Sequence, residues 1–170
     1  MGLFDFFTST RKPGAGVPVL PAQAVRDKLL AINRPTAPFQ IIDGSAEGVD
    51  LIAEWRIVDA KWYEIFAKAG LKKAFKISMK FDEATHEVRA MDRELTIEWC
   101  AGVPSVSFAV SAFKGQQQSI EFGRAYGFTE KLELGQIYNY HFDTNELKQP
   151  IQTAVTESGW TYKGVAFGKL

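Results

Sequence analysis

The sequence predicts a single α+β domain, in which a curved, mainly antiparallel sheet of about six to eight strands packs against two or three helices. Three observations lead to this prediction. From about Phe75 to Phe142, apolar residues fall on every second position, which is the period of a half-buried β-strand. Shorter segments place apolar residues at helical spacing instead. The chain has 170 residues, 46% of them hydrophobic, which suits one domain with a proper core.

A first helix is predicted near the start of this domain, over residues 21–33 or 22–33. Val25, Leu29 and Ile32 recur at helical spacing, and a proline suits the opening turn of a helix. The prolines that follow in the sequence end the segment. These residues should therefore supply one amphipathic helix that covers the sheet.

Two strands and a second helix are predicted next. The apolar alternation indicates strands over 39–42 and 49–58, with a turn at 43–45 between them. A helix should then run over 59–70, because Asp is a good N-cap and Gly often follows the last helical turn. Trp62 belongs to the apolar stripe of this helix.

The sheet continues with a hairpin whose register can be written down from the sequence. Residues 82–85 suit a tight turn. We expect the register that places Lys80 opposite Glu87 and Met79 opposite Val88. This pairing puts opposite charges on one face and apolar pairs on the other, which is consistent across both faces.

The alternation changes phase after this hairpin. Apolar residues fall on even positions before 91–93 and on odd positions after it, so we predict a β-bulge or a break there. Further strands are predicted over 106–112, 120–122 and 138–142.

The C-terminal stretch predicts a helix and a last strand. A helix that opens at Gln149 and Pro150 after a preceding helical turn, and ends at Gly159, is favoured over a start at residue 143 or 144. The earlier start would place Pro150 in the second turn, where proline clashes with the preceding backbone. Residues 160–167 should form the final strand.

The first twenty residues are predicted to be separate from the domain, which then spans residues 21–170. Residues 1–7 are apolar and aromatic, and a linker rich in Pro and Gly follows them, which indicates flexibility. The apolar segment is expected to dock on the same chain or on a neighbouring subunit. Membrane docking through so short a peptide would be weak.

Composition excludes several classes of protein. Twenty basic and twenty acidic residues give a net charge of zero, which argues against nucleic acid as a partner. The single cysteine, Cys100, cannot form an intramolecular disulfide and is interpreted as an apolar filler. No apolar run reaches the ~20 residues that span a bilayer, and no secretory leader is recognisable. A cytoplasmic protein that is not integral to a membrane is expected.

The usual catalytic and cofactor motifs are missing from the sequence. It contains no nucleophile elbow, phosphate loop or zinc-binding spacing, so no cofactor and no metal is predicted. Two pairs could still support general acid–base catalysis: His141 with Asp143, and Glu94 with Glu98, each on one strand face. A polar, salt-bridged strand face is the plainer interpretation of both pairs.

The leading hypothesis is therefore a non-catalytic binding or protein-interaction module. A curved sheet can enclose an aromatic cavity against a helix, and its ligand would be small and partly apolar, or another protein chain. The candidate lining residues are Trp55, Trp62, Trp99, Arg124, Tyr126, Tyr138 and Tyr140. One alternative is a small enzyme that uses the His141 or Glu94 pair. Another is an assembly protein that docks through residues 1–7 and forms a homo-oligomer.

The opening Met-Gly-Leu-Phe-Asp-Phe, residues 1–6, resembles the start of an uncharacterised bacterial cytoplasmic protein family of unknown function. The resemblance implies a bacterial, cytoplasmic protein. It covers six residues and implies no role for any of them.

Overall fold

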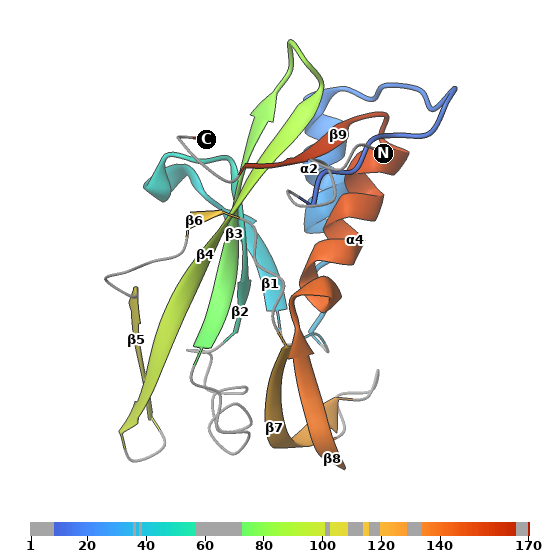
Figure 1. The fold of residues 1–170 in the computed structure, drawn as a ribbon. Coiled ribbons are helices and arrows are strands. Elements are labelled where there is room, and N and C mark those ends of the chain that lie inside the picture. The colour runs from blue at the N-terminus through green and yellow to red at the C-terminus, as the bar shows by residue number, and fades with distance from the viewer. Residues whose placement is uncertain are drawn as a thin grey trace.

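The computed structural model shows an α+β fold in which two helices cover one side of a twisted sheet (Figure 1). Only the backbone is described for residues 73–75, 94–100, 103–108, 114–115, 120–128 and 134–146. The residues that the structure describes are 9–35, 37, 39–56, 73–100, 103–108, 114–115, 120–128, 134–165 and 170.

The sheet has a continuous path of five strands, and each neighbouring pair on this path is antiparallel. These strands are β1 (Phe39–Asp43), β2 (Leu51–Trp55), β3 (Lys73–Asp82), β4 (Glu87–Cys100) and β5 (Val103–Phe108). A short 3₁₀ helix, η1 (Ser45–Glu47), connects β1 to β2. The strands predicted over 39–42 and 49–58 are thus found, whereas the helix predicted over 59–70 lies outside the described residues.

Two further strands pair with β4 beside this path. They are β6 (Lys114–Gly115), which is antiparallel to β4, and β9 (Thr161–Gly164), which is parallel to it. The α+β class and the mostly antiparallel sheet are confirmed. The path is shorter than the six to eight strands predicted, and β9 makes the sheet mixed. β9 follows α4 in the chain, so no tight hairpin turn, which would impose antiparallel pairing, connects it to β4.

The remaining strands form a separate two-stranded sheet. β7 (Ile120–Phe128) pairs with β8 (Leu134–Asp143), and this hairpin lies below the helix that follows it (Figure 1). The apolar alternation of residues 120–142 was expected to extend the main sheet. Alternation predicts strands but does not say which strands pair, because pairing depends on the rest of the chain.

Strand β4 is the centre of the sheet. One of its edges pairs with β3 without interruption, from Glu87 opposite Asp82 to Thr96 opposite Lys73. The prediction of a bulge or a break at 91–93 is therefore wrong, because β4 runs through these residues with one register against β3. Both faces of β4 are covered at this point, since three consecutive residues, Ala90 to Asp92, are buried. The apolar positions change phase although the backbone register does not.

The hairpin between β3 and β4 has a different register from the one predicted. Lys80 lies opposite Arg89, not Glu87, and Met79 lies opposite Ala90. The difference is a shift of two residues, which keeps the apolar pairs on one buried face. Lys76 and Ser78, predicted on the opposite face, are buried as well. The predicted ion pair between Lys80 and Glu87 is lost.

The turn explains this shift. The Asp82 carboxylate accepts hydrogen bonds from the backbone N–H groups of Ala84 (3.0 Å) and Thr85 (3.3 Å). Asp82 is thereby kept as the last residue of β3, and the loop moves on to residues 83–86. His86 closes the loop with a φ of 52°, in the left-handed region.

The outer edge of β1 is closed by side chains. The Asn33 amide donates to the carbonyl of Ile41 (2.7 Å) and accepts from its N–H group (2.6 Å). Arg56 donates to the carbonyl of Phe39 (3.2 Å). These contacts occupy backbone groups that could otherwise pair with another chain. Asn33 can do this because the first helix, α2 (Ala22–Leu30), ends three residues before it.

The second helix, α4 (Thr144–Glu157), begins earlier than predicted and contains Pro150. Proline inside a helix costs about 3 kcal/mol. Leu147, Ile151 and Val155 lie on one face of α4 and are fully buried, each contributing about 1.5–3 kcal/mol. Their packing outweighs the cost of the proline, so the prediction of a start at Gln149 is wrong.

A buried ion pair joins α4 to the centre of the sheet. Lys148 Nζ lies 2.5 Å from Asp92 Oδ2, and both side chains are fully buried. Asp92 belongs to β4, opposite Ile77 of β3. The pair therefore connects a helix to the middle of the sheet through the core.

Residues 9–20 run along β9 and across the end of α4. Arg11 forms an antiparallel bridge with Tyr162, through two backbone hydrogen bonds of 2.8 and 2.9 Å. Leu20 N–H donates to the Ser158 carbonyl (2.9 Å), and Trp160 Nε1 donates to the Leu20 carbonyl (2.8 Å). The described part of the predicted linker is thus hydrogen-bonded to the C-terminal elements.

Gly159 allows this crossing. It follows α4 with a φ of 75°, and a Cβ atom there would lie 2.5 Å from the Pro18 carbonyl oxygen. The chain both reverses in the left-handed region and approaches a second backbone at this residue.

Among the described residues, no helix combines the length and apolar character that a membrane span requires.

We predict that Gly159→Ala destabilises the protein more than Gly48→Ala does. Both glycines have a φ of 75°, but nothing lies within 4 Å of a Cβ atom at Gly48. Gly48→Ala should lower the free energy of unfolding by about 1–2 kcal/mol through backbone strain. Gly159→Ala should lose about 1–3 kcal/mol more, because the new methyl group meets the Pro18 backbone. Urea unfolding measures both; equal losses would show that residues 9–20 do not hold this position in solution.

We predict that Lys148→Met lowers the free energy of unfolding by about 3–5 kcal/mol, because it leaves the Asp92 charge buried. Lys163→Met is the control: Lys163 is 47% exposed, lies 3.5 Å from Glu87, and should lose under about 1 kcal/mol. The double variant Asp92→Leu with Lys148→Met should lose less than the sum of the single variants, by at least about 1 kcal/mol. Additive losses in urea unfolding would argue against coupling between the two charges.

Candidate functional site

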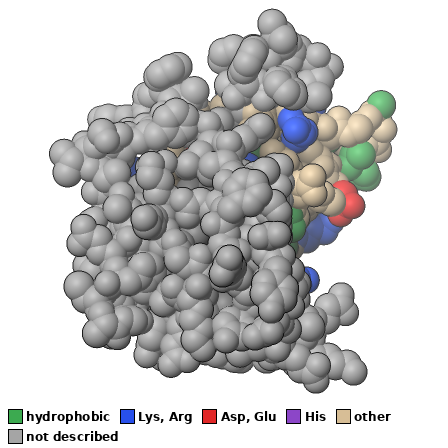
Figure 2. All heavy atoms as spheres, turned by 60° about the horizontal axis from the view of Figure 1, so that its bottom comes forward, with side chains coloured by type: hydrophobic (Ala, Val, Ile, Leu, Met, Phe, Trp, Pro, Cys, Tyr) green, Lys and Arg blue, Asp and Glu red, His purple; other side chains and the backbone are tan. Residues whose placement is uncertain are grey.

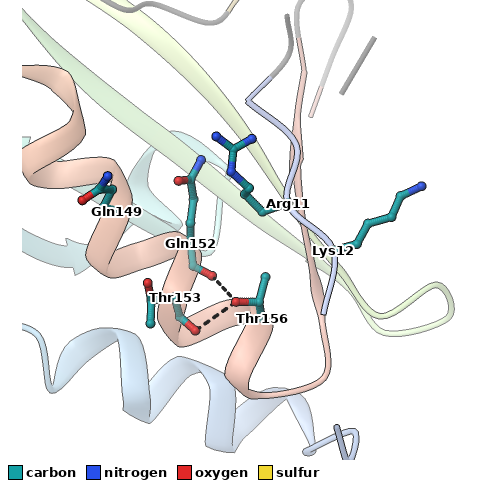
Figure 3. Close-up of a pocket in the computed structure, with 6 residues that line it drawn as sticks. All are labelled: Arg11, Lys12, Gln149, Gln152, Thr153 and Thr156. Atoms are coloured by element: carbon teal, nitrogen blue, oxygen red, sulfur yellow. Dashed lines mark hydrogen bonds between the residues drawn. The ribbon is translucent and has the colours of Figure 1, made fainter. Parts of the chain in front are cut away.

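A polar pocket lies between the N-terminal segment and α4, and we refer to it as the α4 pocket (Figure 3). Its volume is about 320 Å³. It is lined by Arg11, Lys12, Gln149, Gln152, Thr153 and Thr156. Two segments from opposite ends of the chain thus form one site.

The helical wall of the α4 pocket is one stripe of polar residues. Gln149, Gln152, Thr153 and Thr156 stand at positions i, i+3, i+4 and i+7, so they are neighbours on the helix surface. The Thr156 hydroxyl is bonded to its own helix, to the carbonyls of Gln152 (2.9 Å) and Thr153 (3.2 Å) (Figure 3). The stripe adjoins the apolar face of α4 that packs on the core.

The opposite wall is held in place by backbone contacts. The bridge to Tyr162 fixes Arg11, and the Arg11 Nη1 group donates to the carbonyl of Thr10 (3.0 Å). Gln152 Nε2 donates to the carbonyl of Ser9 (2.9 Å), which ties the two walls together. Both walls are therefore held in place within the fold.

The charge of the lining is positive. Arg11 and Lys12 are the charged groups among the six lining residues, and the other four carry amides or hydroxyls. In Figure 3 the Arg11 and Gln152 side chains extend in the same direction, whereas Lys12 extends away from α4. Elsewhere, on the described part of the face in Figure 2, basic, acidic and hydrophobic side chains are interspersed.

Buried polar groups lie next to the lining residues. The Tyr162 side chain is fully buried, and burial raises the pKa of its hydroxyl well above the usual value. The negative charge of Asp92 raises this pKa further, while the positive charge of Arg11 lowers it. Tyr162 Oη and the buried Ser9 Oγ have no hydrogen-bond partner among the described residues.

Trp55 is the one predicted aromatic lining residue whose side chain the structure describes. It is 6% exposed and contacts Phe39 edge to face, with ring centroids 6.1 Å apart. Trp55 belongs to the hydrophobic core and does not line the α4 pocket.

The other predicted lining residues are placed only by their backbones, or not at all. Trp62 lies outside the described residues. Trp99 is in β4, opposite Pro104. Arg124 and Tyr126 lie on β7, Tyr138 and Tyr140 lie on β8, and the two strands pair with each other. Their role as ligand contacts stays a prediction.

The two predicted acid–base pairs lie in different sheets. Glu94 and Glu98 are in β4, and His141 and Asp143 are in β8. Only their backbones are described, so catalysis by either pair stays a prediction, as does docking through residues 1–7.

The α4 pocket was missed at the level of sequence for two reasons. A polar stripe beside an apolar one is the ordinary pattern of a helix with a solvated face. Arg11 and Lys12 stand in a stretch rich in Pro and Gly, which reads as a linker. The helical spacing of the four polar residues could have indicated one wall of the pocket. The second wall depends on the contact between Arg11 and Tyr162, which the sequence does not indicate.

The described residues contain no group of three or more His, Cys, Asp or Glu side chains that could hold a metal ion. In comparisons with known proteins, no family model, no curated protein and no solved structure matches the chain.

Proposed function

We propose that this protein is a non-catalytic binding module and that the α4 pocket is its binding site. The observation that carries the proposal is the pocket itself, in which polar side chains from two ends of the chain surround about 320 Å³. Ligand pockets of proteins are typically about 300–1,000 Å³ in volume. A small molecule therefore suits this site.

The chemistry of the lining favours recognition over catalysis. General acid–base catalysis at neutral pH needs a group that titrates near pH 7, and a threonine nucleophile needs a base beside it. The lining offers a guanidinium, an ammonium, two amides and two hydroxyls. The Thr156 hydroxyl is already bonded to backbone carbonyls. Such groups orient a ligand without transferring protons.

The polar lining also bears on the kind of ligand. Aromatic residues predicted a partly apolar ligand, but the α4 pocket is lined by polar side chains. Gln152 holds a fixed orientation through its bond to Ser9, so part of the lining needs no ordering when a ligand enters. We propose a polar small molecule as the ligand of this pocket.

We predict that a pocket-filling substitution abolishes ligand binding. The full chain, labelled with ¹⁵N, is screened by NMR against a library of anionic, neutral and cationic small molecules. At least one compound should cause saturable shifts in the amides of residues 11–12 and 149–156. Thr153→Trp should weaken that binding by at least about tenfold, because the indole occupies the pocket while Thr153 itself is exposed.

Thr85→Trp is the matched control, since Thr85 is also exposed but lies in the β3–β4 turn. It should leave the binding unchanged. The proposal fails if no compound shifts these amides in a saturable manner. It also fails if Thr153→Trp binds the compounds as well as Thr85→Trp does.

A further inference from the structure

We infer that the α4 pocket recognises an oxyanion, namely the phosphate or carboxylate group of a small molecule, with Arg11 as its main contact. This inference rests on the proposed function and adds the chemical class of the ligand.

The charges of the lining support this class. Arg11 and Lys12 contribute two positive charges, and none of the six lining residues carries a carboxylate. Guanidinium groups bind carboxylates and phosphates through paired N–H donors, with better geometry than an ammonium. Because Arg11 extends beside Gln152 while Lys12 extends away from α4, Arg11 should make the direct contact (Figure 3). Lys12 should act mainly through its charge.

The neutral lining residues supply further donors. Gln149 carries an amide NH₂ group and Thr153 a hydroxyl, and both stand on the stripe of α4 that faces the pocket. Oxyanions accept several hydrogen bonds at once, so a site with a cation and neutral donors suits them. The Lys148 ammonium is paired with Asp92, so this buried pair adds no net charge beneath the pocket.

Two buried hydroxyls lie on residues next to the lining. Ser9 Oγ and Tyr162 Oη are buried and have no hydrogen-bond partner among the described residues. Backbone groups of these two residues are bonded to the lining, the Ser9 carbonyl to Gln152 and the Tyr162 N–H and carbonyl to Arg11. Neither residue lines the pocket itself. Unpartnered buried hydroxyls are costly, and bound water or ligand usually satisfies them.

The volume of the pocket suits a small molecule. About 320 Å³ holds a phosphate or dicarboxylate with a few further atoms. Inorganic phosphate and succinate are therefore suitable probes, and they separate the two sources of an oxyanion.

The test is an NMR titration of the full chain with sodium phosphate and, separately, with sodium succinate. Sodium chloride at matched ionic strength is the reference. We expect saturable shifts in the amides of residues 11–12 and 149–156 with at least one oxyanion and none with chloride. Phosphate binding alone would identify a phosphorylated ligand, and succinate binding alone a carboxylated one.

Three variants test which positively charged residue binds the oxyanion. Arg11→Gln should weaken oxyanion binding by about tenfold or more, and Lys12→Gln by a smaller factor. The backbone bridge between Arg11 and Tyr162 does not involve the substituted side chain, so the fold should be kept. Lys28→Gln removes an equal charge from the exposed face of α2 and should leave binding unchanged.

Three outcomes would overturn the inference. One is that chloride causes the same shifts as the oxyanions, which would show an effect of ionic strength alone. Another is that Lys28→Gln weakens binding as much as Arg11→Gln does. In the third, neutral or cationic compounds of the screen occupy the α4 pocket while phosphate and succinate do not. That result would leave the proposed function standing, whereas a screen without any ligand would remove both.

Discussion

The ion pair between Asp92 and Lys148 is the constraint on which the arrangement of this protein depends. Its two charges are fully buried, one on the central strand β4 and the other on α4. A buried pair adds little net stability, because both charges must leave water. It does penalise any displacement of the helix, since a shift of α4 along β4 would leave each charge buried without the other. The pair therefore selects one position for α4, and with it the position of the polar stripe.

That position of α4 determines what the N-terminal segment can do. Gln152 lies one helical turn after Lys148, and its amide reaches the Ser9 carbonyl. At the end of the helix, Gly159 leaves room for the Pro18 backbone to cross. The pocket is thus a consequence of packing: a helix held by a core charge, and a segment held against it by β9. A site of this kind has its walls set before the ligand arrives, which lowers the cost of binding.

The β3–β4 hairpin shows how far local reasoning from the sequence reaches. Alternation correctly predicted the two strands and placed Ile77, Met79, Val88 and Ala90 on one buried face. It did not predict that Lys76 and Ser78, on the opposite face, are buried as well. The register was wrong by two residues, because both registers keep the apolar residues on one face. The Asp82 carboxylate decided between them by accepting hydrogen bonds from Ala84 and Thr85. Pro150 is a comparable case, in which the burial of Leu147 and Ile151 outweighed a local cost that the sequence indicated correctly.

By itself, the sequence determined the α+β class, the mostly antiparallel sheet and the apolar stripe of α2, since these follow from the period of the apolar residues. It placed the candidate ligand contacts mainly among aromatic residues, of which Trp55 lies in the core. Only the tertiary structure decided that β9 runs parallel to β4, and that Arg11 faces the stripe of α4. Neither feature has a local signature, because each is a contact between residues far apart in the chain. The period of apolar residues indicates which side chains are buried. A binding site depends instead on which residues, far apart in the chain, come into contact when it folds.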